Sequence, residues 1–205
     1  TGTLIIDSGS TFTTPNSFTI DDAVLELHQS ASWTNAASVA LTLGATNGTL
    51  DMRDFTTSSG ITFSSVTVES SGKITHGSNT TAQTHVVNIS ATTFSINSGG
   101  SIDVDGKGYA ADNPATGKGG GSNCAGGGGG GGGSGGASQT WSGCTSSGGS
   151  TYDTNTNPVY IGAGGGTRSG SSTTTASQGG GLVKLSVSGT FTNNGTITAD
   201  GAASS

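Results

Sequence analysis

Carboxylates are the first residues in this sequence whose type and spacing could support catalysis or metal binding. Asp103, Asp105 and Asp200 lie in or directly after two similar phrases, "GSIDVDG" and "GTITADG". Clustered carboxylates cleave glycosidic bonds by acid–base chemistry, and carboxylate oxygens also bind Ca²⁺. Asp and Gly are equally typical of the turn that ends a strand. We favour the turn, and keep a Ca²⁺ site at these three residues as the weaker alternative.

Other motifs that could support catalysis or metal binding lack the flanking structure or the spacing that such sites require. The segment 132–136, "GGSGG", matches the nucleophile elbow, which requires a strand before it and a helix after it. Polyglycine supplies neither. His28, His76 and His85 have no metal-ligand spacing, and His76 occupies an inward position of an alternating run, which predicts packing. We therefore predict no catalytic residues and no cofactor, with a polysaccharide-active enzyme as the lesser alternative.

Composition limits the classes of protein that this chain can belong to. Its 205 residues include 39 Gly, 9% charged and 29% hydrophobic residues, with a net charge of -6. Disordered chains are usually more charged, so a thin all-β core fits better. Only 6 Lys and Arg are present, which argues against nucleic acid, and no apolar run approaches a membrane span. A start at Thr1 without Met fits a processed protein that is secreted or displayed at the cell surface.

Two cysteines and four glycosylation sequons are compatible with an extracellular setting. Cys124 and Cys144 bracket a glycine run, and a disulfide between them would close a loop of about 20 residues, worth roughly 3 kcal/mol. Asn-x-Ser/Thr sequons are frequent by chance in a chain so rich in these residues. The candidate glycosylation sites are Asn47, Asn79, Asn88 and Asn194.

One short phrase recurs along the chain. A glycine or alanine, one variable residue and then an apolar residue begin "GTLII", "AVLEL", "GTLDM", "GKITH", "GSIDV" and "GTITA". These copies start at residues 2, 23, 48, 72, 100 and 195. Period-2 alternation follows each start, and a second apolar run closes most units. Short strands at this interval, without helices between them, predict the stacked coils of a solenoid.

The fold that we predict is all-β: a parallel β-helix, or β-solenoid, of about five to six coils with a long glycine-rich insertion. Like residues of successive coils should stack in columns. A β-sandwich or jelly roll is the alternative, because it also has short strands and frequent turns. The alignment of the whole phrase favours the solenoid. The predicted parts are coils over 1–106, an insertion over 107–180 and a final coil over 181–205.

The insertion contains eight consecutive glycines at 126–133. Such a segment reads as a flexible linker, but ordering glycine is costly, and a folded glycine tract implies that backbones must approach closely. An irregular loop and laterally hydrogen-bonded glycine rods both remain open. Either could be pinned by the aromatic residues Trp141, Tyr152 and Tyr160.

The pattern over 100–201, "GSIDVDGKG" followed by a glycine-rich stretch and "GGGLVKLSVSGTFTNNGTITADG", resembles glycine-rich β-helical repeats of bacterial surface and secreted proteins. The glycine tracts are also similar to those of polyglycine-bearing tail-fibre adhesins of phages. The resemblance implies a structural or adhesive role at a surface, and it supplies no catalytic residues.

The two ends of the solenoid determine the function that we expect. A β-helix ends in rows of unpaired backbone groups, which recruit other strands unless a cap covers them, and the sequence contains no cap motif. We predict a structural subunit of an extracellular filament, a homopolymer joined head to tail by stacking or strand complementation. A surface or phage adhesin that binds glycans is the alternative, and an ice-binding Thr ladder is weaker because it is intermittent. The predicted polymer interface is Gly2, Leu4, Ile6, Ile197 and Ala199.

Overall fold

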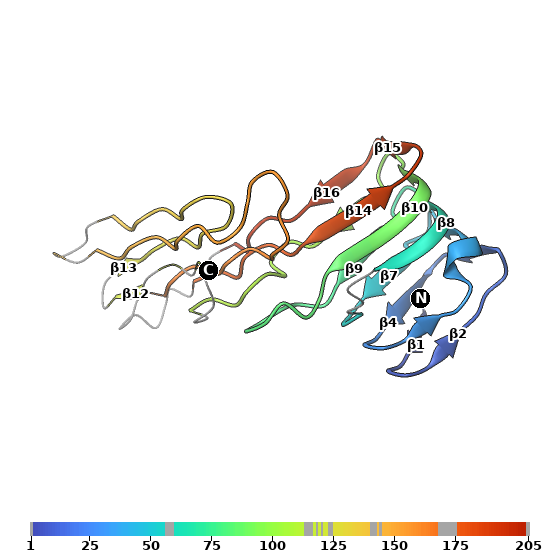
Figure 1. Ribbon diagram of the computed structural model, residues 1–205, viewed down its shortest axis with the longest axis horizontal. Helices are drawn as coiled ribbons and strands as arrows, with labels where there is room; N and C mark the ends of the chain where they lie inside the picture. The colour runs from blue at the N-terminus through green and yellow to red at the C-terminus, as the bar shows by residue number, and fades with distance from the viewer. Residues whose placement is uncertain are drawn as a thin grey trace. The chain divides into compact units, whose positions relative to one another are not determined.

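The computed structural model describes residues 2–55, 60–112, 117, 119, 121–122, 125–139, 143, 145–167 and 176–203. These residues form strands and one 3-10 turn, and they contain no α-helix (Figure 1). The chain divides into two compact units. Unit 1 comprises Thr1–Gly77, Thr84–Asp103 and Val183–Thr198, and unit 2 comprises Ser78–Gln83, Val104–Leu182 and Ala199–Ser205.

The first sheet of unit 1 is built from the recurring phrase. Each strand pairs in parallel with the copies before and after it in the sequence, so that Leu25 lies beside Leu4 and Leu50. The glycine or alanine that opens each phrase is either the first residue of the strand or the residue directly before it. In sheet order the strands are β1 (Gly2–Ile6), β4 (Ala23–Leu27), β7 (Thr49–Met52), β9 (Lys73–His76), β11 (Ser101–Asp103) and β16 (Thr196–Thr198).

The second sheet is built from the apolar run that closes each repeat. Its strands β3 (Ser17–Ile20), β6 (Ala40–Leu43), β8 (Ile61–Val68) and β10 (Val87–Ile96) pair in parallel and in register. Strand β10 then pairs with both β14 (Val183–Val187) and β15 (Phe191–Asn193). A short parallel pair, β2 (Thr11–Phe12) with β5 (Ser32–Trp33), and the 3-10 turn η1 (Ala36–Ser38) complete the unit.

The core of unit 1 consists of stacked apolar columns. Alternate residues of a strand point to the same face of the sheet, so the alternating apolar side chains lie together on the face that lines the core. Trp33 is buried against Phe12, Phe18 and Phe63, with ring centroids 5.0 to 5.6 Å apart. Parallel pairing of sequential repeats is the pattern of a β-solenoid, and the prediction of a parallel β-helix is confirmed. The sandwich alternative is wrong, because both sheets are parallel throughout.

Unit 2 contains glycine segments that hydrogen-bond laterally through their backbones. Gly128 N donates to Gly136 O at 2.9 Å, Gly149 N to Gly128 O at 2.9 Å, and Gly162 N to Gly180 O at 2.8 Å. A Cβ atom added at Gly129 would overlap the carbonyl of Ala163. The described part of the insertion is therefore a packed structure, as expected for glycine chosen for close backbone approach. One short antiparallel pair, β12 (Gly121–Ser122) with β13 (Ala125–Gly126), accompanies it.

The boundaries of the two units differ from the predicted 1–106, 107–180 and 181–205. The segment Ser78–Gln83 and the residues after Thr198 belong to unit 2. Side-chain and backbone hydrogen bonds explain this: Asn79 Nδ2 donates to Lys107 O at 2.8 Å, and Gln178 Nε2 donates to Asn79 O at 3.0 Å. Sequence periodicity could not reveal these bonds, because they join polar residues outside the repeated phrase. Cys124, Cys144 and Trp141 lie outside the described residues.

Candidate functional site: the two end edges of the solenoid

The first sheet of unit 1 contains one apolar column whose ends differ from its middle. Its four middle residues are 0 to 2% exposed, whereas Leu4 is 48% exposed and Ile197 is 38% exposed. Among the described residues, β1 pairs only with β4 and β16 only with β11. The column therefore has two open ends. In register it comprises Leu4, Leu25, Leu50, Ile74, Ile102 and Ile197.

The second sheet ends in the same way. Phe94 is fully buried, while Phe191, which lies beside it with ring centroids 6.0 Å apart, is 46% exposed. At the opposite edge Phe18 is partly exposed. The register of this column is Phe18, Leu41, Val66, Phe94 and Phe191.

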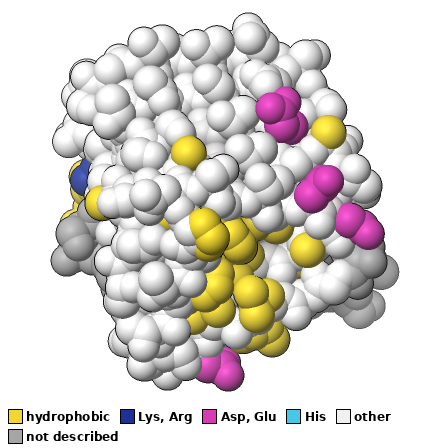
Figure 2. Space-filling view, turned by 90° about the vertical axis from the view of Figure 1, so that its right-hand side faces the viewer, with side chains coloured by type: hydrophobic (Ala, Val, Ile, Leu, Met, Phe, Trp, Pro, Cys, Tyr) yellow, Lys and Arg dark blue, Asp and Glu magenta, His cyan; other side chains and the backbone are white. Residues whose placement is uncertain are grey.

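The N-terminal edge presents a hydrophobic patch. Leu4 and Ile5 are both half-exposed, although they point to opposite faces of β1. Figure 2 views the side of unit 1 on which β1 and β2 lie in Figure 1, and shows a band of hydrophobic side chains open to solvent between neutral polar surfaces. An unpaired strand edge combined with exposed apolar side chains is the arrangement that promotes pairing with another chain.

The predicted interface residues do not all lie on these edges. Gly2 and Leu4 are exposed on β1, and Ile197 on β16, whereas Ile6 is buried. Ala199 belongs to unit 2, and the chain after it bonds to the insertion: Ala202 N donates to Gln178 O at 3.0 Å. The solenoid edge therefore ends at β16, and Ala199 is not part of it.

The carboxylates proposed for Ca²⁺ have other partners. Asp103 lies 3.0 Å from Lys73 Nζ, and Asp105 Oδ1 accepts a 2.7 Å hydrogen bond from Asp200 N. Asp103 belongs to unit 1 and the other two to unit 2. Within the described part of the chain, no group of three or more His, Cys, Asp or Glu side chains could hold a metal ion. These contacts assign the Asp103 carboxylate to an ion pair and the Asp105 carboxylate to a hydrogen bond with the backbone N–H of Asp200.

A charged cluster on the outer face of the first sheet was only partly visible in the sequence. Glu26 and Asp51 are in register on adjacent strands, and Arg53 lies 3.2 Å from Glu26 and 3.8 Å from Asp51. His28 lies between Glu26 and Asp54, at 3.3 and 3.4 Å. The strand register places the two carboxylates side by side, whereas Arg53 and His28 follow their strands and could not be placed from periodicity. The guanidinium offsets part of the negative charge of the two stacked carboxylates.

The histidines have packing environments rather than ligand geometry. His76 is fully buried, as predicted, and its Nδ1 lies 2.6 Å from Gly77 O. Burial lowers the pKa of His85, since desolvation outweighs the attraction of the Asp54 and Asp51 carboxylates. His85 is therefore held in its neutral form.

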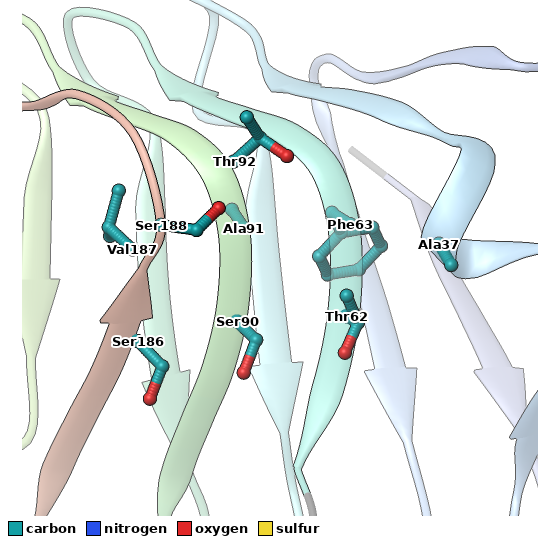
Figure 3. A pocket seen from close by; sticks show the side chains of 9 residues that line it. All are labelled: Ala37, Thr62, Phe63, Ser90, Ala91, Thr92, Ser186, Val187 and Ser188. Atoms are coloured by element: carbon teal, nitrogen blue, oxygen red, sulfur yellow. The ribbon is translucent and has the colours of Figure 1, made fainter.

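A shallow groove of about 460 Å³ crosses the outer face of the second sheet. Figure 3 shows the hydroxyl side chains of Thr62, Ser90 and Ser186 in a row across three strands, in agreement with the strand register. The buried ring of Phe63 and the methyl of Ala91 contribute its apolar part. The groove has no charged side chain in its lining.

The sequence predicts an intermittent Thr-x-Thr ladder, and on this sheet one of the two columns that such a ladder needs is continuous. The strands β3, β6, β8, β10 and β15 each contribute one hydroxyl to this column. A lattice-matching face requires a second ladder beside the first, and that neighbouring column is interrupted by Ala40. The continuous ladder comprises Thr19, Thr42, Thr67, Ser95 and Thr192.

The four sequons differ in accessibility. Asn47 and Asn194 are exposed and Asn88 is half-buried, whereas Asn79 is fully buried with its amide nitrogen donating to Lys107 O. A glycan on that nitrogen is incompatible with this hydrogen bond, so the folded chain offers three accessible sequons.

No family model, curated protein or solved structure matches this chain. None of the described helical segments is long and apolar enough to cross a membrane.

Proposed function

We propose that this chain is a structural subunit of an extracellular filament, in which copies join head to tail through the end edges of unit 1. The observation that carries the proposal is the column that begins at Leu4 and ends at Ile197. Its middle residues are excluded from water, while both ends remain exposed. A second copy placed at either end continues the column and buries both side chains.

The proposed contact is heterologous. Strand β1 of one copy pairs with β16 of the next in parallel, which places Leu4 on Ile197 in the register of the other strands. Backbone hydrogen bonds provide directionality, and each fully buried apolar side chain contributes about 1.5–3 kcal/mol. Because the two surfaces differ, the contact is head to tail; it need not close into a ring, and stacking along the solenoid axis then extends it as a filament.

The two sheets end at different levels, which favours strand complementation over simple stacking. The first sheet has six strands, but the second-sheet column that ends at β15 has five. A neighbour that pairs through β1 leaves one strand position of the second sheet between Phe191 and its own Phe18. An extended segment of the neighbouring copy in this position would cover both aromatic rings.

Negative-stain electron microscopy of purified, undenatured protein tests this proposal. We expect filaments with an axial repeat of about 29 Å, six strands at about 4.8 Å each. The variant Leu4→Lys should remain monomeric, because a charged edge residue blocks strand pairing. The matched control Val159→Lys replaces a side chain of similar exposure, 46%, in unit 2 and should still form filaments. Discrete particles of native protein at all concentrations would contradict the proposal.

A further inference from the structure

One loop of unit 2 exposes two large hydrophobic side chains at its tip. Tyr160 is 50% exposed and Val159 is 46% exposed, and they are the exposed large hydrophobic side chains of unit 2 within the described residues. Exposed apolar side chains on an ordered loop are a feature of binding surfaces, because function rather than packing places them there.

Asp153 fixes the backbone of this tip. Its Oδ2 accepts hydrogen bonds from the N–H groups of Val159 and Tyr160, both at 2.9 Å, and its Oδ1 accepts one from Thr154 N at 2.8 Å. Desolvation raises the pKa of Asp153, but these three N–H donors outweigh it and hold the pKa below its ordinary value. The carboxylate therefore stays ionised and keeps its three donors.

Two further side chains hold the loop from behind. Gln83 Nε2 donates to Val159 O at 3.0 Å, and Ile161 N donates to Gln83 Oε1 at 2.9 Å. The hydroxyl of Tyr152 donates to Ile161 O, and its ring centroid lies 6.1 Å from that of Tyr160. The tip is thus ordered before any ligand arrives, which reduces the entropic cost of binding.

The chemistry around Tyr160 is neutral and polar. The segment 154–157, "TNTN", is exposed throughout and offers hydroxyl and amide groups. Residues 145–167 contain one charged side chain, Asp153, whose two oxygens already accept N–H groups. Within residues 145–167 a polyanion therefore meets no cation. Two exposed side chains are also far too small a patch for a stable protein interface, which buries about 1,200–2,000 Å².

We propose that Tyr160, with the amides of Asn155 and Asn157, forms a binding site for a neutral carbohydrate. A sugar presents an apolar C–H face and a rim of hydroxyls. The phenol ring complements the face, and the amides and threonine hydroxyls complement the rim. Tyrosine and asparagine on a rigid loop are the combination that protein paratopes use for small polar surfaces. The site shares no residue with the proposed filament contact.

The test is retention on insoluble neutral polysaccharides (cellulose, chitin, mannan), with soluble oligosaccharides as competitors, in the full-length Leu4→Lys background. That background separates the two proposals, because it removes filament avidity. We expect at least one polysaccharide to retain the protein. Tyr160→Ser should weaken retention by about tenfold or more, whereas Tyr160→Phe keeps the ring and should stay within about threefold. Ile5→Ser, a change of similar exposure in unit 1, should have no effect.

Three results would overturn this inference. They are the absence of retention on every neutral polysaccharide, equal retention of Tyr160→Ser, and loss of retention by Ile5→Ser. Self-association that Tyr160→Ser abolishes would identify a second copy as the occupant and would equally exclude the carbohydrate. An unchanged near-ultraviolet circular dichroism spectrum of each variant, apart from the missing ring, verifies that unit 2 remains folded.

Discussion

Leu4 and Ile197 are the two ends of one in-register column, although 193 residues separate them in the chain. The residues between them in the column are buried, and these two are exposed at 48% and 38%. Each therefore faces solvent through a surface that the fold buries everywhere else. The proposed filament follows from this relationship, because one end of the column is complementary to the other.

The column predicts a sharp difference between substitutions at its middle and at its end. Leu50→Ala removes a fully buried side chain and should lower the free energy of unfolding by about 2–5 kcal/mol. Leu4→Ala in a monomeric subunit should lower it by less than about 1 kcal/mol, since Leu4 already contacts water. Urea titration followed by the fluorescence of buried Trp33, in an Ile197→Lys background, measures both. An equal loss of unfolding free energy in the two variants would contradict the placement of Leu50 in the middle and Leu4 at the end of the column.

Arg53 is predicted to relieve the repulsion between two stacked carboxylates. Arg53→Met leaves Glu26 beside Asp51 and should destabilise unit 1 by up to about 1 kcal/mol, because Arg53 is half-exposed. The loss should shrink in molar salt and disappear when Glu26→Gln is added. Lys184→Met, an exposed lysine on β14, is the control and should be neutral. A loss that salt leaves unchanged would exclude the electrostatic explanation.

The glycine run should tolerate a methyl group at one position and not at another. Gly129→Ala places a Cβ atom against the carbonyl of Ala163, whereas a Cβ at Gly133 meets nothing within 4 Å. We expect Gly129→Ala to expose unit 2 to hydrogen exchange and proteolysis. Gly133→Ala should be neutral or stabilising by about 0.4–1 kcal/mol, because it restricts the unfolded chain. Equal hydrogen exchange and equal proteolysis of unit 2 in the two variants would argue against lateral packing of the glycine segments.

Unit 2 should lose stability at alkaline pH through Tyr152. Burial raises the pKa of this phenol to about 12, with smaller contributions from Tyr109 and Asp153. Because the folded pKa lies above the ordinary value of 10.0, the phenol stabilises the fold fully below pH 10 and loses that contribution as the pH rises toward 12. Hydrogen exchange of unit 2 across this range should show the loss. Tyr152→Phe should reduce that pH dependence and leave the smaller part due to Tyr109, whose pKa burial also raises. An unchanged pH dependence in the variant would exclude Tyr152 as a cause.

The sequence was sufficient to predict the solenoid because its physical determinants are local and repeated. A glycine-led phrase with period-2 alternation predicts both the strand and the face that it buries, and Leu25, Leu50 and Ile74 stack as expected. The inward position of His76 followed from the same pattern. The exposed edge residues Leu4 and Ile197 were predicted because they belong to the first and last copies of the phrase.

The parts that could not be predicted depend on long-range polar bonds. Gln83 lies 76 residues before Val159, and no periodicity connects them. The transfer of Ser78–Gln83 and Ala199 to unit 2 follows from single hydrogen bonds of this kind. Tyr152 and Tyr160 were both named as residues that could pin the insertion; the Tyr152 hydroxyl donates to Ile161 O, whereas Tyr160 is exposed. Composition alone does not distinguish a buried tyrosine from an exposed one.

The most direct test of the head-to-tail contact is the mass of an equimolar mixture of Leu4→Lys and Ile197→Lys. Each variant retains one competent end, so each alone should be monomeric. Mixed, they should form a dimer and nothing larger, because the joined ends are competent and the outer ends are blocked. Analytical ultracentrifugation distinguishes these species. A mixture that remains monomeric, while the native protein polymerises, would show that β1 and β16 do not form the contact.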